Sequence, residues 1–233
     1  MTSRLRFKRE IILPIFTILI GICLVELTRK RSQNLEAAQR FLPPPPSIER
    51  FSAGYNDVIA DVLWLRLIQD ADTCDRPGAA GQRCQSEKGW VFQMLDAITK
   101  LAPKFAAPYW HGATILSVLV GDKEGARIIF ERGMENFPND WQLPYRAAFH
   151  ALENLGDVQK AAELLVQAGK NGAPQWVFAL SARLYTKRGQ AILAKSILED
   201  VLASDPDSRW APRLRSRLEE IDQTLTNSSG SSY

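Results

Sequence analysis

From residue 55 onward, apolar residues recur three and four positions apart along almost the whole chain. This spacing places apolar side chains on one face of an α-helix, whereas a half-buried strand needs a strict alternation that the sequence does not sustain. Glycines and prolines fall between the apolar segments, where they end one helix and allow a turn to the next. The pattern therefore predicts an all-α fold, with helices that include residues 55–72, 90–103 and 209–225.

A short phrase returns inside this helical region. The six residues GDKEGA at 121–126 reappear in outline as GDVQKA at 156–161 and more faintly as GQAILA at 189–194. The final alanines of the three copies are 35 and 33 residues apart. A period of about 34 residues is typical of stacked helix–turn–helix units, so we expect each glycine to form a turn and each alanine to be a helix-packing contact.

The repeated unit resembles the tetratricopeptide repeat. Residues 107–138 match best, residues 175–206 match nearly as well, and residues 142–174 form an imperfect copy because Ala173-Pro174 replaces the closing proline. The positions that carry the resemblance are Trp110, Ala113, Gly121, Ala126, Phe130 and Pro138, then Tyr145, Ala148, Leu152, Gly156, Ala161, Leu165 and Ala168, and finally Phe178, Ala182, Tyr185, Gly189, Ala194, Leu198 and Pro206. The resemblance implies a helix–turn–helix repeat solenoid over residues 52–206, with three to four repeats and a loop inserted at 73–88 in the first.

The carboxyl-terminal end follows a different pattern. Residues 207–226 carry one apolar stripe, formed by Leu214, Leu218, Ile221 and Leu225. One apolar face predicts a capping helix that covers the last repeat. Residues 227–233 are rich in serine, and we expect this tail to be disordered.

Residues 1–28 contain an apolar run with basic flanks. The run covers residues 11–25 and can extend to Leu27, which is short beside the roughly 20 residues of a usual membrane-spanning helix. Lysine and arginine side chains at both ends can reach the lipid headgroups and make up the difference. Because no small-x-small cleavage site follows, the sequence favours an uncleaved transmembrane anchor, with a cleaved signal peptide and a buried core helix as the alternatives. Residues 29–51, which hold four consecutive prolines, are predicted to be a polar, stiff linker.

Two cysteines bear on the location of the folded part. Cys74 and Cys84 lie ten residues apart in one polar, glycine-bearing stretch. A disulfide between them would persist only in an oxidising compartment, and the alternative is two unrelated surface thiols. We therefore predict a single-pass protein of the inner (cytoplasmic) membrane, with its amino terminus in the cytoplasm and its C-terminal domain facing the periplasm. Lysine and arginine are almost evenly divided around the apolar run, which leaves a cytosol-facing domain open.

Charge and motif content exclude several function classes. Residues 1–40 hold eight basic and three acidic residues, for a net +5, while the remainder holds 21 basic and 23 acidic residues, for a net −2. Basic charge that flanks an apolar run, rather than covering the folded body, disfavours a nucleic-acid binder. The sequence shows no phosphate-binding loop, no nucleophile elbow and no metalloprotease motif, and it contains only two histidines. We therefore expect no enzyme activity, no metal, no cofactor and no small-molecule substrate.

The resemblance also implies where a partner would bind. In tetratricopeptide arrays the first helices of successive repeats line a concave groove that holds extended peptides or partner helices. If Tyr145, Ala148 and Leu152 are packing positions, other side chains on the first helices are free to line this groove. The candidate groove residues are His111, Arg146, His150, Glu153 or Asn154, Arg183 and Lys187. Their positive charge suggests an acidic or carboxylate-bearing peptide as the ligand, and the alternative is a solvated helix face.

Together these features predict a membrane-anchored scaffold or adaptor that binds other membrane or periplasmic proteins to assemble or support an envelope complex. Two alternatives remain open: a periplasmic chaperone or quality-control helper with several clients, and a regulatory subunit of a membrane enzyme or transporter. Contact with lipid is expected only through the amino-terminal helix. The stretch at residues 54–72 is apolar nearly all round, which favours coverage by a partner protein or by self-association.

Overall fold

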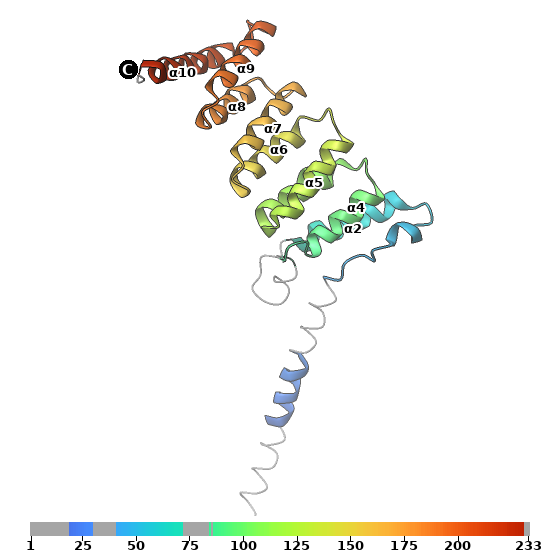
Figure 1. Ribbon diagram of the computed structural model, residues 1–233. Helices are drawn as coiled ribbons and strands as arrows, with labels where there is room; N and C mark the ends of the chain where they lie inside the picture. Colours follow the sequence, from blue (N-terminus) through green and yellow to red (C-terminus); the bar gives the residue numbers. More distant parts are fainter. Residues whose placement is uncertain (1–18, 30–40, 72–83, 85, 231–233) are drawn as a thin grey trace, which may run out of the picture.

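The computed structural model describes residues 19–29, 41–71, 84 and 86–230 (Figure 1). Within these ranges the regular structure is entirely helical and no strand is present. Residues 19–29 are helical. The elements that follow are η1 (Ile48–Phe51), α2 (Asn56–Asp70), α4 (Trp90–Leu101), η3 (Pro108–Gly112), η4 (Ile115–Val120), α5 (Lys123–Asn136), α6 (Gln142–Phe149), η5 (His150–Asn154), α7 (Val158–Lys170), α8 (Trp176–Lys187), α9 (Ala191–Ser204) and α10 (Ala211–Gly230). The first of these, η1, is a 3₁₀ helix, and η3, η4 and η5 are π-helical segments.

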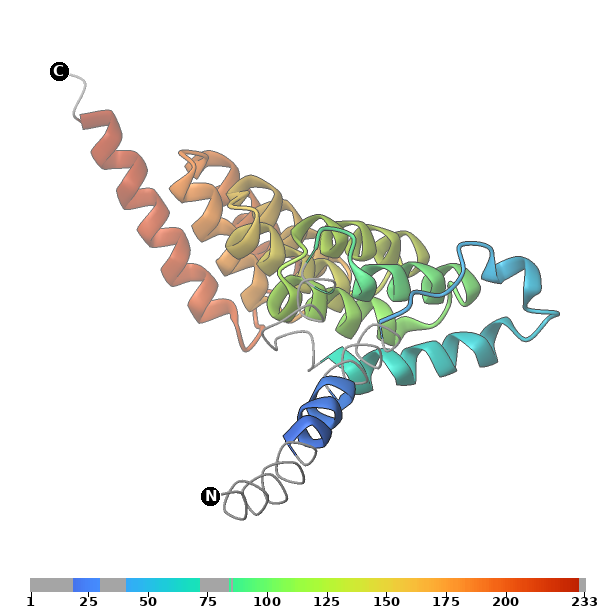
Figure 2. The same cartoon turned by 90° about the horizontal axis from the view of Figure 1, so that it is seen from below.

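Consecutive helices pack side by side along the chain. The contacts join α2 to α4, α6 to α7, α7 to α8 and α8 to α9, and η3 and η4 lie against α5. The last helix, α10, rests on both α9 and α8 and closes the end of the stack opposite α2 (Figures 1 and 2). The described part of the chain therefore has the predicted all-α architecture, in which each helix buries its apolar face against its neighbours in the sequence.

Three glycine turns join the helices of successive pairs. Gly121, Gly156 and Gly189 have φ angles of +76°, +69° and +76°, which are left-handed conformations. A Cβ atom is strained in this region, so glycine is the residue that ends one helix and allows the next to begin within one or two residues. The turns lie where the recurring phrase begins, which confirms the prediction that the phrase marks a turn between helices.

The alanines that end the recurring phrase are packing contacts, as predicted. Ala126, Ala161 and Ala194 are each 0% exposed, and they lie on α5, α7 and α9. At such positions the helices approach closely, because alanine places only one carbon between the two backbones.

Enlarging one of these alanines tests their role. Replacing Ala194 with leucine is expected to lower the free energy of unfolding by about 1–3 kcal/mol, because the added atoms must displace packed neighbours. Ala203, which is exposed on the same helix, is the matched control, and its replacement with leucine is expected to change stability by less than about 0.5 kcal/mol. Urea denaturation of both variants measures the difference, and equal values for the two would contradict the assignment.

The structure shows specific packing at the amino-terminal edge of the folded body and a long helix at the other end. Phe41 was placed in the 29–51 linker, but its side chain is 4% exposed and its ring lies 5.1 Å from that of Trp90 in an edge-on contact. Trp90 also donates a hydrogen bond from Nε1 to the Leu42 carbonyl oxygen over 3.2 Å, so the folded body begins before the four prolines. At the other end, α10 continues to Gly230 and includes part of the tail predicted to be disordered. Once a helix has formed, each added residue gains a backbone hydrogen bond, which extends it through poor helix formers.

The structure describes only part of the predicted transmembrane helix. Residues 19–29 form the described part of the apolar run, and they are helical with exposed leucine, isoleucine and valine side chains. No helix within the described ranges has both the length and the apolar character needed to cross a membrane. Residues 11–18, which form the first part of the run, lie outside the described residues.

The predicted disulfide also involves a residue outside the described ranges. Cys84 is 0% exposed, while Cys23 is an exposed free thiol. Cys74 lies in the segment that the structure does not describe, together with most of the inserted loop at 73–88. The pairing of Cys74 with Cys84 stays a prediction.

Candidate functional site

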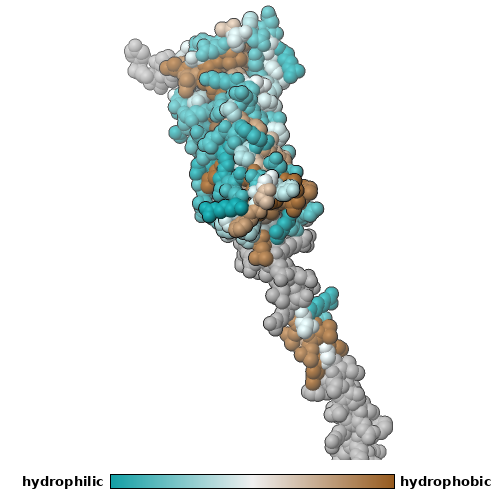
Figure 3. Space-filling view, turned by 90° about the vertical axis from the view of Figure 1, so that its right-hand side faces the viewer, coloured by the Kyte–Doolittle hydropathy of each residue, from teal (hydrophilic) through white to brown (hydrophobic). Residues whose placement is uncertain are grey.

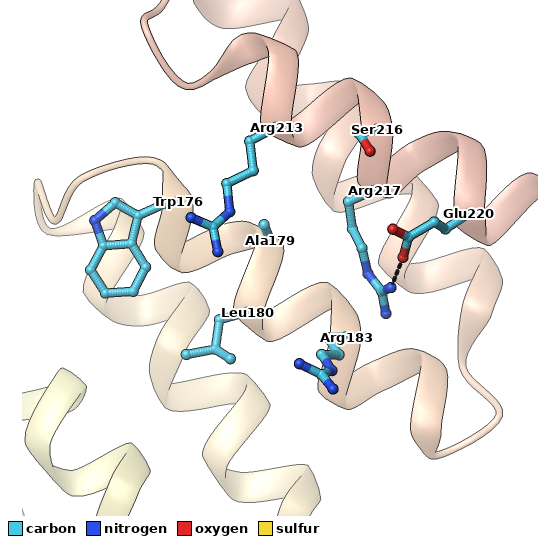
Figure 4. A pocket seen from close by; sticks show the side chains of 8 residues that line it. All are labelled: Trp176, Ala179, Leu180, Arg183, Arg213, Ser216, Arg217 and Glu220. Atoms are coloured by element: carbon cyan, nitrogen blue, oxygen red, sulfur yellow. Dashed lines mark hydrogen bonds and ion pairs between the residues drawn. The ribbon is translucent and has the colours of Figure 1, made fainter.

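A pocket of about 480 Å³ opens between α8 and α10 (Figure 4). Helix α8 supplies an apolar wall, and α10 supplies most of the charged side chains that face it. The lining residues are Trp176, Ala179, Leu180, Arg183, Arg213, Ser216, Arg217 and Glu220. Helix α10 packs against both α9 and α8, and the pocket lies along its contact with α8.

Three arginines and only one carboxylate line this pocket. Arg217 donates a hydrogen bond from Nη1 to Glu220, whereas Arg183 and Arg213 have no ion-pair partner among the described residues. The Nε atom of Arg217 is buried and makes no hydrogen bond. Arg183 and Arg213 are exposed, and guanidinium groups bind carboxylates with paired hydrogen bonds. The pocket therefore has the charge and the free donors to hold an anionic group, most directly a carboxylate.

An aromatic ladder connects the pocket to the preceding repeat. The ring of Trp176, which lines the pocket, lies 5.8 Å from that of Tyr145 on α6 in an edge-on contact. Tyr145 in turn contacts Phe149 at 5.0 Å and Trp141 at 5.9 Å. Phe149 is 41% exposed, so the ladder offers apolar surface to a ligand as well as packing between repeats. The combination suits a segment that carries apolar side chains beside a carboxylate.

The structure brings only one predicted groove residue into the pocket. Arg183 and Lys187 are exposed on α8, as predicted, but only Arg183 lines the pocket. Arg146 is half-buried on α6. His111 and Glu153 are exposed elsewhere on the first helices of their pairs. The sequence-based set therefore locates one anchor of the pocket rather than its whole lining.

Four of the eight pocket residues were missed because they belong to α10. This helix was predicted as a cap, a role that its buried apolar face fulfils. Arg213 and Arg217 are four residues apart on the same helix, which puts them on one face toward α8. This spacing could have identified the pocket from the sequence. Two basic residues one turn apart on a capping helix can both face the helix that it covers.

His150 does not lie in a groove as predicted, because its side chain is buried. Its ring is 4% exposed and packs inside the body, 5.8 Å from the ring of Phe130. The buried stripe of this helix runs through Leu143 and Ala147, and it includes position 150 rather than Tyr145. Tyr145 was taken as a packing position because it matches the repeat pattern, but it is only half-buried in the ladder beside Trp176. Each residue of an α-helix adds a rotation of about 100°, so an error of one position in the packing residue moves the inferred exposed face of the helix by that angle.

The His150 ring joins two repeats through a chain of hydrogen bonds. Its Nδ1 lies 2.8 Å from the Ser117 hydroxyl, and its Nε2 lies 3.0 Å from the Lys123 carbonyl oxygen. Asn154 donates a further hydrogen bond from Nδ2 to the Ser117 hydroxyl oxygen over 2.8 Å. These contacts fit a neutral ring that donates from Nε2 and accepts at Nδ1. Burial lowers the pKa of His150, which favours the same neutral form.

Neither a metal-ligand cluster in the described residues nor a known relative points to another role. Within the residues that the structure describes, no three histidine, cysteine, aspartate or glutamate side chains gather as metal ligands would. No protein-family profile matches the chain, and no curated protein resembles its sequence. The pocket between α8 and α10 is therefore the candidate functional site on the strength of its own geometry.

Proposed function

We propose that this chain is a membrane-anchored, tetratricopeptide-like scaffold that binds partner proteins and so assembles or supports an envelope complex. Paired helices with left-handed glycine turns and buried alanines at a regular spacing support the repeat assignment. A stack of this kind presents one long surface built from several repeats, which suits the binding of an extended segment.

The pocket between α8 and α10 is the single observation that carries the binding role. Arg183 and Arg213 line the pocket, are exposed, and have no ion-pair partner in the described structure. An acidic side chain or a terminal carboxylate of a partner would supply the missing acceptors. Apolar residues of the same segment would then lie along the ladder formed by Trp176 and Tyr145. The proposed ligand is an extended, acidic segment of another protein.

The location is proposed from the sequence. The apolar run at residues 11–27 has basic residues on both sides, and the four prolines at 43–46 would hold the body away from the bilayer. Cys74 and Cys84 are spaced for a disulfide in an oxidising compartment. We therefore place the body on the periplasmic side. Mass spectrometry after alkylation with and without reductant tests this, because cysteines in a disulfide gain the mass of the alkylating group only after reduction.

Crosslinked co-purification of the full chain from membranes tests the function. A scaffold is expected to retain one partner, or a few, in near-stoichiometric amount after a high-salt wash. Many substoichiometric clients would instead indicate a chaperone. The absence of any crosslinked protein from membranes of the native host would contradict the proposal.

A further inference from the structure

One carboxylate of the chain itself already lies in the pocket between α8 and α10. Glu220 accepts a hydrogen bond from Nη1 of Arg217, three residues before it on the same helix, and forms an ion pair with it (Figure 4). Arg183 and Arg213 line the same pocket and have no ion-pair partner in the described structure. The lining therefore carries three positive charges and one negative charge, a net +2. A negatively charged ligand enters a pocket in which one arginine of the three is already engaged.

Glu220 takes the end of Arg217 that a ligand would need. A carboxylate binds a guanidinium group through two neighbouring N–H groups, either along the Nε side or at the end that carries both Nη atoms. The Nε atom of Arg217 is buried, so an incoming group must approach from the Nη end. Because Nη1 is already bonded to Glu220, a ligand carboxylate and Glu220 compete for the same donors.

The Glu220 side chain can leave Arg217 at little cost. Glu220 is 57% exposed and Arg217 is 20% exposed, so water reaches the carboxylate when the pair opens. Exposed ion pairs of this kind contribute little to stability, because pairing also restricts two flexible side chains. The two residues are neighbours on one face of α10, so the pair forms again whenever the pocket empties. While it is formed, the negative charge of Glu220 weakens the attraction of the pocket for an anion.

We propose that Glu220 is an internal competitor for the acidic segment that this pocket binds, and that it limits the affinity of the pocket. The inference rests on the proposed function and adds the residue that regulates the same site. An acidic side chain of the partner replaces Glu220 on Arg217, and the released Glu220 carboxylate turns to water. Arg183 and Arg213 are available to the partner before this exchange, and Arg217 only after it.

Fluorescence anisotropy with the full chain in detergent tests the competition. The probe is a rhodamine-labelled hexaglutamate peptide with a leucine at each end. Glu220→Gln keeps the size of the side chain and removes its charge, and it is expected to bind the probe at least about threefold more tightly than the wild type. The matched control is Glu219→Gln, which removes the same charge from an exposed neighbour outside the pocket and is expected to bind as the wild type does. Equal affinities of the two variants, or weaker binding by Glu220→Gln, would overturn the proposal.

A double-mutant cycle tests whether Glu220 acts through Arg217. In an Arg217→Gln background, Glu220→Gln is expected to lose most of its effect on probe affinity, because no guanidinium group is left to release. Circular dichroism checks that the single and double variants keep their helix content. An undiminished gain in the Arg217→Gln background would show that Glu220 acts only by its general charge, which contradicts the competition.

A variant with Arg183→Glu and Arg213→Glu separates this inference from the proposed function. Hydrophobic residues gather at the lower end of the folded body in Figure 3, so a probe with leucines can also adhere outside the pocket. The double variant measures that background and is expected to bind the probe at least about tenfold more weakly than the wild type. If it binds as the wild type does, or if no variant binds, the proposed binding site fails together with the inference. If binding depends on both arginines but not on Glu220, the site stands and only the competitor is overturned.

Discussion

Replacing Asp122 with alanine is expected to lower the free energy of unfolding by about 2–4 kcal/mol, because one carboxylate satisfies two separate segments. Its Oδ1 accepts a hydrogen bond from the Gly125 backbone N–H over 2.8 Å, which caps the amino terminus of α5. Its Oδ2 accepts from the Lys88 backbone N–H over 3.0 Å, which fixes the end of the inserted loop to the next repeat. The side chain is nearly buried, so water does not replace the lost oxygens.

Asp157 provides the matched control for this prediction. It occupies the same position in the next copy of the phrase and caps α7 through the Lys160 backbone N–H at 2.9 Å, but it is exposed and makes no second contact of the same kind. Replacing Asp157 with alanine is expected to cost about 1 kcal/mol. Guanidinium unfolding followed by circular dichroism measures both variants. If the two substitutions cost the same, the link between the loop and α5 contributes nothing to stability.

Replacing His150 with leucine is expected to lower the free energy of unfolding by about 1–3 kcal/mol at pH 7, because the Ser117 hydroxyl and the Lys123 carbonyl lose a buried partner. The effect depends on pH. Burial is the main cause that lowers the pKa of His150 in the folded chain, and the positive charges of Lys123 and Arg127 act in the same direction. Well above a pH of about 6.5, the usual pKa of histidine, the ring is neutral in both states and contributes no pH dependence.

Below that pH the unfolded chain takes up a proton that the folded chain resists, so wild-type stability falls until the lowered pKa of the folded state is reached. The leucine variant lacks this group, and its stability is therefore expected to approach that of the wild type as the pH falls from 7 to 5. Chemical denaturation at several pH values measures the two curves. His111→Leu, at an exposed histidine, is the control for the loss of one imidazole. A constant gap between wild type and His150→Leu would show that the ring is not held neutral by burial.

The repeat pattern predicted the fold because its residues act locally. Gly121, Gly156 and Gly189 each form a turn with their own backbone, so the local sequence is enough to predict it. The buried alanines lie five residues after each of these glycines, so their positions could be predicted in the same way. The phrase also contains an informative difference. Position 125 is glycine because a Cβ there would lie 2.3 Å from an Asp122 carboxylate oxygen, whereas the next copy has Lys160 at the same place. The second contact of Asp122, to the inserted loop, crosses 34 residues and leaves no mark on the local pattern.

The candidate site was harder to predict because it depends on how α10 crosses α8. The groove hypothesis identified Arg183 from the face of its own helix, but Arg213 and Arg217 approach it from a helix about 30 residues later. His150 was misplaced for a related reason. The match to the repeat pattern made Tyr145 a packing position, whereas its ring lies against that of Trp176 at the junction between two helix pairs. Such contacts between elements are set by packing, which the periodicity of one helix does not encode.

Partner retention by a charge-reversed pocket is the most direct test of the proposed function. The full chain carrying Arg183→Glu and Arg213→Glu is compared with the wild type by quantitative co-purification from crosslinked membranes. The control carries Arg188→Glu and Arg209→Glu, which reverse the same amount of charge at exposed positions outside the pocket. The proposal predicts that the amount of acidic partner that co-purifies with the pocket variant falls at least about tenfold, while the control variant retains the wild-type amount. Equal retention by both variants would contradict the claim that this pocket holds the partner.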